Sequence, residues 1–138
     1  MKEHVALIIT NDNNETLFIQ RSFKKNTLAG AWSFPSGTVE EGEEINATAI
    51  REALEELDIE IHPKETIAIK ELPEFSVKLL FILCTIKNKE PRINEPDEIE
   101  KIEFLKFKDF FDKFTDDNIG HGLIWLRKNP KIWEKHNL

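Results

Sequence analysis

The sequence contains only one cysteine, Cys84, so the chain cannot form an internal disulfide, which fits a reducing compartment. This cysteine lies within the apolar run LLFILCTI, and we expect it to be a buried core thiol. The four histidines are scattered without the spacing of metal ligands, so we assign no chemistry to them. Internal repeats, linkers and low-complexity tracts are also missing. A chain of 138 residues is therefore expected to form a single domain, residues 1–138.

Long apolar runs are absent as well. No segment approaches the length of a membrane span, and the first ten residues, MKEHVALIIT, lack the layout of a signal peptide. We therefore expect a cytoplasmic protein with no membrane partner. The chain also lacks an excess of basic residues, since its formal net charge is −7. Because binding along a nucleic-acid backbone requires a basic face, a long nucleic acid is not an expected partner. A small phosphorylated ligand stays compatible, since metal ions can lie between carboxylate and phosphate oxygens.

Glutamate is abundant in residues 37–59, GTVEEGEEINATAIREALEELDI, and the second half of this stretch predicts an amphipathic helix. Its apolar residues recur at helical spacing and predict one stripe: Ile50, Ala53, Leu54 and Leu57. The opposite side carries three carboxylates: Glu52, Glu55 and Glu56. Like charges one helical turn apart repel one another. Such a cluster therefore indicates either an ordinary solvated face or a divalent cation held among the oxygens.

The spacing of the whole stretch favours the cation. A glycine is followed by five residues, a glutamate, seven residues, an Arg-Glu pair, two residues and a Glu-Glu pair; the positions are Gly37, Glu43, Arg51, Glu52, Glu55 and Glu56. This pattern resembles the Nudix box, and Trp32 and Pro35 are similar to the family's segment before the box. At the level of motifs the resemblance covers residues 21–59, and elsewhere it rests on the order of elements.

Two positions differ from the family pattern. Ser36 stands where the family has a first glycine, and we expect its side chain to lie in a tight turn and to alter substrate fit. Asp58 replaces the glycine that follows the helix, a position where the left-handed conformation is usual. Aspartate tolerates that conformation at a modest strain. Neither change removes a carboxylate from the box.

The resemblance implies the Nudix fold, an α/β/α sandwich with a mixed β-sheet between helices. Hydrophobic patterning agrees with this class: we expect strands at 5–10, 16–21, 77–86 and 99–107, strand pieces broken at Pro63 within 59–69, and closing helices at 108–115 and 120–128. The 77–86 strand is predicted to be central and buried on both faces. Trp125 and Trp133 are expected to pack in the core.

The resemblance also implies the chemistry: Mg²⁺-dependent hydrolysis, with Mn²⁺ as a substitute, of a pyrophosphate bond in a nucleoside diphosphate derivative. A nucleoside triphosphate and an ADP-sugar are equally compatible substrates. The implied metal ligands are Glu52, Glu55, Glu56, the Gly37 carbonyl and Glu98. The catalytic base would be Glu55 or Glu98. Arg51 would orient Glu43 or Glu55, which leaves Glu43 supporting the site without touching the metal.

Substrate contacts are predicted from residue chemistry near the box. Arg21 can bind a phosphate with two parallel hydrogen bonds. Trp32 and Phe34 either stack on a base or pack in the core. The lysines of the loop that follows Arg21, SFKKNTLAG, either contact a phosphate or are only solvated. Specificity is expected from the loops at 22–31, 71–75 and 88–97. The sequence leaves homodimerisation open.

Two other functions are compatible with parts of the sequence. The stretch QRSFKKNTLAGAW is similar to isopentenyl-diphosphate isomerases of the same family, but that activity uses a cysteine upstream of the helix, and Cys84 lies downstream. A catalytically silent nucleotide-binding module would be expected to carry damaged box carboxylates, and none is damaged here. The sequence therefore favours a hydrolase.

Overall fold

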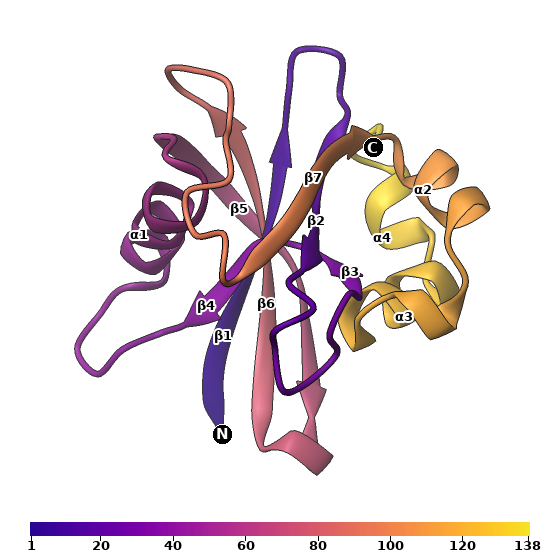
Figure 1. Ribbon diagram of the computed structural model, residues 1–138, viewed down its shortest axis with the longest axis horizontal. Coiled ribbons are helices and arrows are strands. Elements are labelled where there is room, and N and C mark those ends of the chain that lie inside the picture. Colours follow the sequence, from indigo (N-terminus) through magenta and orange to yellow (C-terminus); the bar gives the residue numbers. More distant parts are fainter.

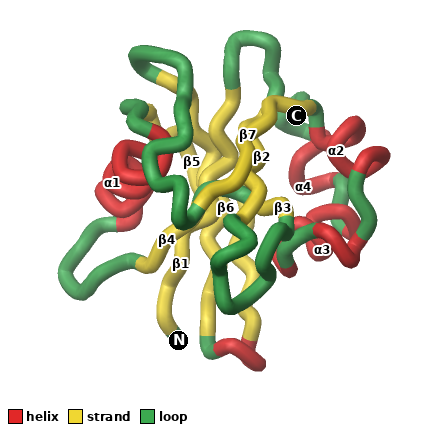
Figure 2. Tube along the Cα trace, in the orientation of Figure 1, coloured by secondary structure: helices red, strands yellow, loops and turns green.

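A mixed seven-stranded β-sheet passes through the middle of the protein, with helix α1 on one side and helices α2 to α4 on the other (Figures 1 and 2). The computed structural model describes residues 1–138. The strands are β1 (Lys2–Thr10), β2 (Thr16–Arg21), β3 (Trp32–Ser33), β4 (Ser36–Thr38), β5 (Ile61–Leu72), β6 (Val77–Ile86) and β7 (Ile99–Leu105). The helices are α1 (Ile45–Leu57), α2 (Phe107–Lys113), α3 (His121–Lys128) and α4 (Lys131–Glu134), with short 3₁₀ turns at Pro73–Phe75 and Asp116–Asn118. The predicted α/β/α sandwich is confirmed.

The strand order is β3-β2-β1-β6-β5, while β4 pairs with β1 and β7 pairs with β2. Strands β1 and β6 are parallel, from Lys2 opposite Val77 to Thr10 opposite Thr85, and every other pairing is antiparallel. Strand β4 adds to the first half of β1, where Gly37 lies opposite Val5. This pairing places the start of the glutamate-rich stretch against the centre of the sheet.

The two faces of β1 bury two separate cores, because successive side chains of a strand point to opposite faces. Val5, Leu7 and Ile9 pack in the core beneath α1, which also contains Cys84. Ala6 and Ile8 pack in the core beneath α2 to α4.

The core beneath α2 to α4 is rich in aromatic rings. Phe18 stacks on Phe110, with ring centroids 3.9 Å apart. Trp133 is buried and donates from Nε1 to the Leu126 carbonyl at 2.9 Å, and Trp125 stacks on Phe81. The predicted packing of Trp125 and Trp133 and the predicted burial of Cys84 are confirmed.

Several predicted boundaries were wrong. Strand β5 continues through Pro63, because this edge strand changes register between Pro63 and Glu65, and such a bulge accommodates the missing N–H of proline. Strand β1 begins at Lys2 and β7 ends at Leu105. The short helix α4 was not predicted. None of the helices has both the length and the apolar composition that crossing a membrane requires.

The buried face of α1 also differs from the prediction. Ile50 and Leu54, expected in the core, are 43% and 50% exposed, whereas Glu56 is only 8% exposed. The predicted burial of Ala53 and Leu57 is confirmed, and Ala49 packs beside them against the sheet. Compared with the prediction, the buried side of α1 is shifted towards Glu52 and Glu56, and Ile50 and Leu54 face outward.

Candidate active site

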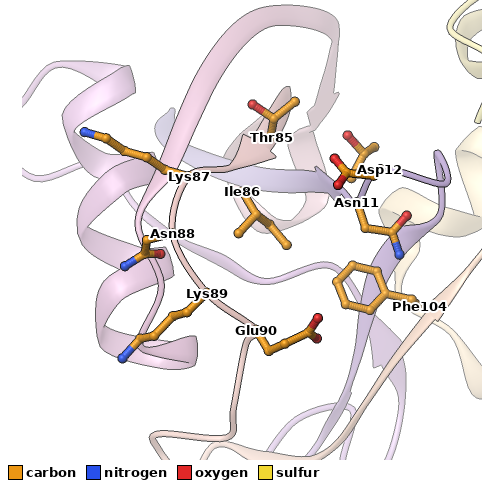
Figure 3. A pocket seen from close by; sticks show the side chains of 10 residues that line it. Asn11, Asp12, Thr85, Ile86, Lys87, Asn88, Lys89, Glu90 and Phe104 are labelled. Atoms are coloured by element: carbon orange, nitrogen blue, oxygen red, sulfur yellow. The ribbon is translucent and has the colours of Figure 1, made fainter.

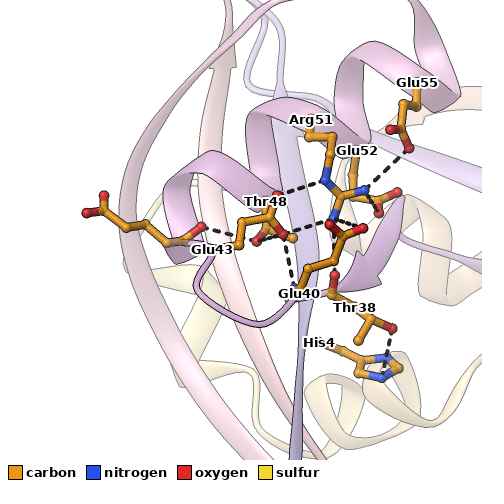
Figure 4. A network of polar contacts seen from close by, with 9 residues as sticks. His4, Thr38, Glu40, Glu43, Thr48, Arg51, Glu52 and Glu55 are labelled. Carbon is orange, nitrogen blue, oxygen red and sulfur yellow. Dashed lines mark hydrogen bonds and ion pairs between the residues drawn. The ribbon is translucent and has the colours of Figure 1, made fainter.

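Glu43 connects the loop before α1 to the helix through hydrogen bonds (Figure 4). Its carboxylate accepts hydrogen bonds from Thr48 Oγ1 at 2.7 Å and from the backbone N–H of Glu40 at 3.1 Å. Arg51 binds the same carboxylate from two nitrogens, Nε at 2.8 Å and Nη2 at 3.0 Å. These bonds favour the ionised form, and they lower the pKa of Glu43 to about 2, with the bond from Arg51 as the largest cause.

Arg51 connects this support to the carboxylates of α1. Its Nη1 donates to Glu52 at 2.9 Å and reaches Glu55 at 3.4 Å, while Nη2 also donates to the Thr38 carbonyl at 3.2 Å. The contacts to Glu43 and Glu55 are those that the sequence suggested, and the contact to Glu52 is an addition. One guanidinium thus fixes the direction of three carboxylates.

Glu52 lies in a space that only glycine at position 37 leaves open. A Cβ atom added to Gly37 would lie 2.1 Å from the Glu52 carboxyl carbon, well inside van der Waals contact. Burial raises the pKa of Glu52, although Arg51 acts in the opposite direction. The carboxylate is therefore held against β4 in a partly desolvated position.

Glu56 is the most deeply buried carboxylate in the protein. It is 8% exposed, and its Oε2 atom has no hydrogen-bond partner. Burial, followed by the charges of Glu52 and Glu95, raises the pKa of Glu56 well above its ordinary value. An unsatisfied buried acceptor costs about 1–3 kcal/mol, so this atom is poised to accept a proton or a cation.

The segment before β7 brings further carboxylates to the same place. Asn94 donates from its backbone to the Glu56 carbonyl and from its side chain to the Glu55 carbonyl, both at 3.0 Å. The turn closes with Glu98 N–H donating to the Glu95 carbonyl at 2.9 Å. Burial, followed by the charges of Glu55 and Glu98, raises the pKa of Glu95. The resemblance implied Glu98 as the carboxylate from this segment, and the structure places Glu95 beside it.

These side chains are not arranged as a preformed metal site, since no three His, Cys, Asp or Glu side chains converge on one point. Arg51 turns Glu52 and Glu55 towards itself, and Lys25 binds Glu98. The donor set nonetheless fits a hard divalent cation, because all its members are oxygen donors and one buried oxygen lacks any partner.

A cavity of about 170 Å³ opens on the face of the sheet that α2 to α4 cover and is lined by residues from five parts of the chain, including Ala6, Phe34 and Phe81 of the aromatic core. Arg21 and Ser36 border it, as predicted residues near the box, and His121 and Gly122 border it from the start of α3. The last two carried no signal in the sequence, because the fold alone brings α3 to this position. Ser36 is not in a tight turn but in extended strand β4, opposite Ala6, so its side chain can border the cavity without strain.

Of the two alternatives left open for Trp32 and Phe34, the structure shows packing in the core. Trp32 is 7% exposed and stacks on Phe114, with ring centroids 5.1 Å apart, so its ring packs in the core and is covered by the closing helices. Phe34 is 3% exposed and contributes only to the wall of the cavity. Arg21 lies at the cavity, and its guanidinium donates to the Thr27 carbonyl at 3.0 and 3.2 Å.

A second cavity, of about 510 Å³, lies at the carboxyl ends of β1 and β6. Figure 3 shows the amines of Lys87 and Lys89 pointing away from its centre, and Lys89 instead pairs with Asp58 at 2.9 Å.

Asp58 has φ 55°, the left-handed conformation that was predicted, and it also binds Arg92 at 2.8 Å. Asp58 therefore ties the 88–97 loop to the end of α1, a role that the sequence did not reveal.

Cys84 has no role at this site. It is fully buried beneath α1, and burial raises the pKa of its thiol to about 12. A protonated thiol in the core is a poor nucleophile. The structure therefore gives no support to an isomerase that depends on a reactive cysteine.

Comparison with known proteins identifies the family. The family model described as NUDIX domain matches residues 2–124, and the chain belongs to the Nudix hydrolase family. It is 34% identical over 110 residues to Nudix hydrolase 10 of Arabidopsis thaliana, a match that covers 76% of this chain and 37% of that protein. It is 30% identical over 87 residues to an 8-oxo-dGTP diphosphatase of Proteus vulgaris, covering 61% of this chain and 77% of that protein.

Solved structures share the fold. A MutT protein from Methanosarcina mazei Go1 superposes with a TM-score of 0.75 at 20% identity, over 99% of this chain and 94% of that one. The chain spans about two fifths of the length of several curated relatives, including Nudix hydrolase 2 of Arabidopsis thaliana, for which the share is 40%.

Proposed function

We propose that the protein is a phosphohydrolase that uses Mg²⁺ to cleave a pyrophosphate bond in a nucleoside diphosphate derivative. The observation that carries this proposal is the unpartnered Oε2 of Glu56, nine-tenths buried beside Glu52 and behind the space that Gly37 leaves open. A protein that merely displayed an acidic surface would leave these carboxylates in water. Here the fold removes them from water at a desolvation penalty, which is expected when a bound cation repays it.

Glu52, Glu55 and Glu56 would hold the cation, with Glu98 and the Gly37 carbonyl as further ligands. When bound, Mg²⁺ neutralises charge on the phosphate oxygens and lowers the pKa of attacking water. Arg51 keeps its positive charge throughout, because its hydrogen bonds to Glu43 raise its pKa further. It therefore acts by orienting Glu52 and Glu55.

Glu55 and Glu98 are the two candidates for the general base. Both side chains are about half exposed, at 49% and 47%, so a water molecule has access to either. Each also forms an ion pair with a basic side chain, Glu55 with Arg51 and Glu98 with Lys25. A base must lie within hydrogen-bond reach of the water it activates. Kinetics of Glu55→Gln and Glu98→Gln will separate them: substitution of the base should lower kcat much more than the affinity for metal.

The 170 Å³ cavity, which Ser36 borders just before Gly37, is the proposed place for the nucleoside part of the substrate. Arg21 lies at its edge and can turn from the Thr27 carbonyl to a phosphate, for which a guanidinium is well suited. The Proteus vulgaris relative is an 8-oxo-dGTP diphosphatase, and a structural neighbour from Streptococcus suis, with a TM-score of 0.64, is an ADP-ribose pyrophosphatase. A nucleoside triphosphate and an ADP-sugar are accordingly the two substrate classes to compare.

The test is release of nucleotide product from a panel that contains ADP-ribose, the eight common (d)NTPs, 8-oxo-dGTP, NADH and a diadenosine polyphosphate. Each compound is incubated with Mg²⁺ and, separately, with EDTA. We expect release from at least one compound with Mg²⁺ and none with EDTA. Silence across the panel, in a protein that still binds Mn²⁺, would instead favour a nucleotide-binding module without catalysis.

A further inference from the structure

Two consecutive lysines bind the segment before β7, and the two ion pairs differ in environment. Lys24 pairs with Asp97 at 3.0 Å, where the two side chains are 76% and 85% exposed. Lys25 pairs with Glu98 at 2.5 Å, where the side chains are 27% and 47% exposed. A fully solvated pair contributes little to stability. The Lys25 pair is the more deeply placed, and it involves a carboxylate of the candidate active site.

Lys25 is the basic side chain that pairs with Glu98. Its charge acts on Glu95 as well as on Glu98, and Glu98 in turn acts on buried Glu56. Arg51 approaches the cluster from α1 and is already bonded to Glu43, Glu52 and Glu55. Glu98 therefore depends on Lys25 for its counter-charge.

The segment that carries Lys25 also reaches the cavity. Ser22 N–H donates to the Glu98 carbonyl at 2.9 Å, and Lys25 N–H donates to the Ser22 carbonyl at 3.2 Å, which fixes the base of the lysine side chain beside Glu98. Arg21 and Leu28, which flank Lys25 in the sequence, line the 170 Å³ cavity. One short segment thus touches both the carboxylates and the proposed place of the substrate.

We propose that Lys25 exchanges partners: it neutralises Glu98 in the metal-free protein and contacts a phosphate oxygen of the substrate once a divalent cation is held by the carboxylates. This role rests on the proposed function. A dication near Glu98 repels the ammonium group, and the flexible four-carbon stem of lysine allows the group to move. The phosphates of the substrate supply the nearest new negative charge. Lys25 would then both weaken metal binding in the absence of substrate and help to hold the substrate.

The test compares Lys25→Gln with Lys24→Gln, which removes the same charge from the neighbouring residue. Mn²⁺ affinity is measured first without substrate, from the electron paramagnetic resonance signal of free Mn²⁺. Affinity for inorganic pyrophosphate is then measured by calorimetry at saturating Mn²⁺. Circular dichroism establishes that both variants are folded.

Opposite changes in the two affinities are expected for Lys25→Gln. Mn²⁺ should bind about two- to tenfold more tightly, because a competing cation is gone, and pyrophosphate about three- to tenfold more weakly. Lys24→Gln should change each affinity by less than about twofold, and Lys25→Arg should restore pyrophosphate binding. Identical behaviour of Lys25→Gln and Lys24→Gln would overturn the proposal, as would tighter Mn²⁺ binding with unchanged pyrophosphate binding. Failure of the wild-type protein to bind Mn²⁺ would overturn the proposed function itself, and the role of Lys25 with it.

Discussion

Gly37 on β4 and Glu52 on α1 lie so close together that a single added methyl group at residue 37 would stand 2.1 Å from the Glu52 carboxyl carbon. The backbone of Gly37 is extended and paired with Val5, so this glycine is not required by an unusual backbone conformation. Glycine is needed at this position because any side chain would collide with the Glu52 carboxylate. The first residue of the box thus sets the position of a carboxylate fifteen residues further along.

Gly37→Ala is predicted to displace the Glu52 side chain while leaving the fold intact, because the end of a flexible side chain can move aside. We expect Mn²⁺ affinity to fall about ten- to a hundredfold, as for other changes that misorient metal ligands. The free energy of unfolding should change by less than about 1 kcal/mol. Ser36→Ala, one residue earlier on the same strand, should leave Mn²⁺ affinity unchanged. Equal affinities in all three proteins would show that Glu52 needs no such space.

Glu43 is predicted to make stability depend on pH in the acid range. Its pKa in the folded protein is about 2, below the ordinary value of 4.5, so its ionised form is favoured by folding. The stabilisation is complete above about pH 4.5 and is lost as the pH falls towards 2. The melting temperature of Glu43→Gln should therefore lie below that of the wild type at pH 6, and the difference should shrink between pH 4.5 and 2. A difference that stays constant over this range would contradict the role assigned to Arg51 and Glu43.

Asp58→Asn is predicted to loosen the 88–97 loop without unfolding α1. Asparagine tolerates the left-handed conformation that Asp58 adopts, but it lacks the charge that binds Lys89 and Arg92. Both ion pairs are at the surface, so the melting temperature should change by no more than about 3 °C. Amide hydrogens of residues 88–97 should exchange faster in the variant, as hydrogen-exchange mass spectrometry can measure. Unchanged exchange in that loop would show that Asp58 serves only the end of the helix.

The sequence predicted those parts of the site that lie close together in the chain. The spacing from Gly37 to Glu56 placed glycine, arginine and carboxylates on one loop and one helix, and the structure brings them together. The sequence did not predict which side of α1 is buried. Periodicity assumes that large apolar residues face the core, yet here Leu54 is half exposed and Glu56 is buried, because the candidate site takes the inner face of the helix.

Contacts between distant parts of the chain were not predictable from residue types. Lys25 and Glu98 are separated by 73 residues, and nothing in either local sequence indicates the other. Trp32 could have stacked on a ligand or packed in the core, and the choice is made by Phe114, which the fold brings over it. His121 reaches the cavity only because α3 begins there.

The most direct test of the central claim is Glu56→Gln, measured for turnover and for stabilisation by metal. The amide keeps the shape of the carboxylate but removes its charge, and it has no charge to bury, so the metal-free variant should be at least as stable as the wild type. Burial raises the pKa of Glu56, so the wild type should lose stability relative to the variant as the pH rises above about 4.5. Mg²⁺ should raise the melting temperature of the wild type but not of the variant, and turnover should fall at least about a hundredfold. A folded Glu56→Gln protein that keeps most of the wild-type activity on the same substrate would contradict the account.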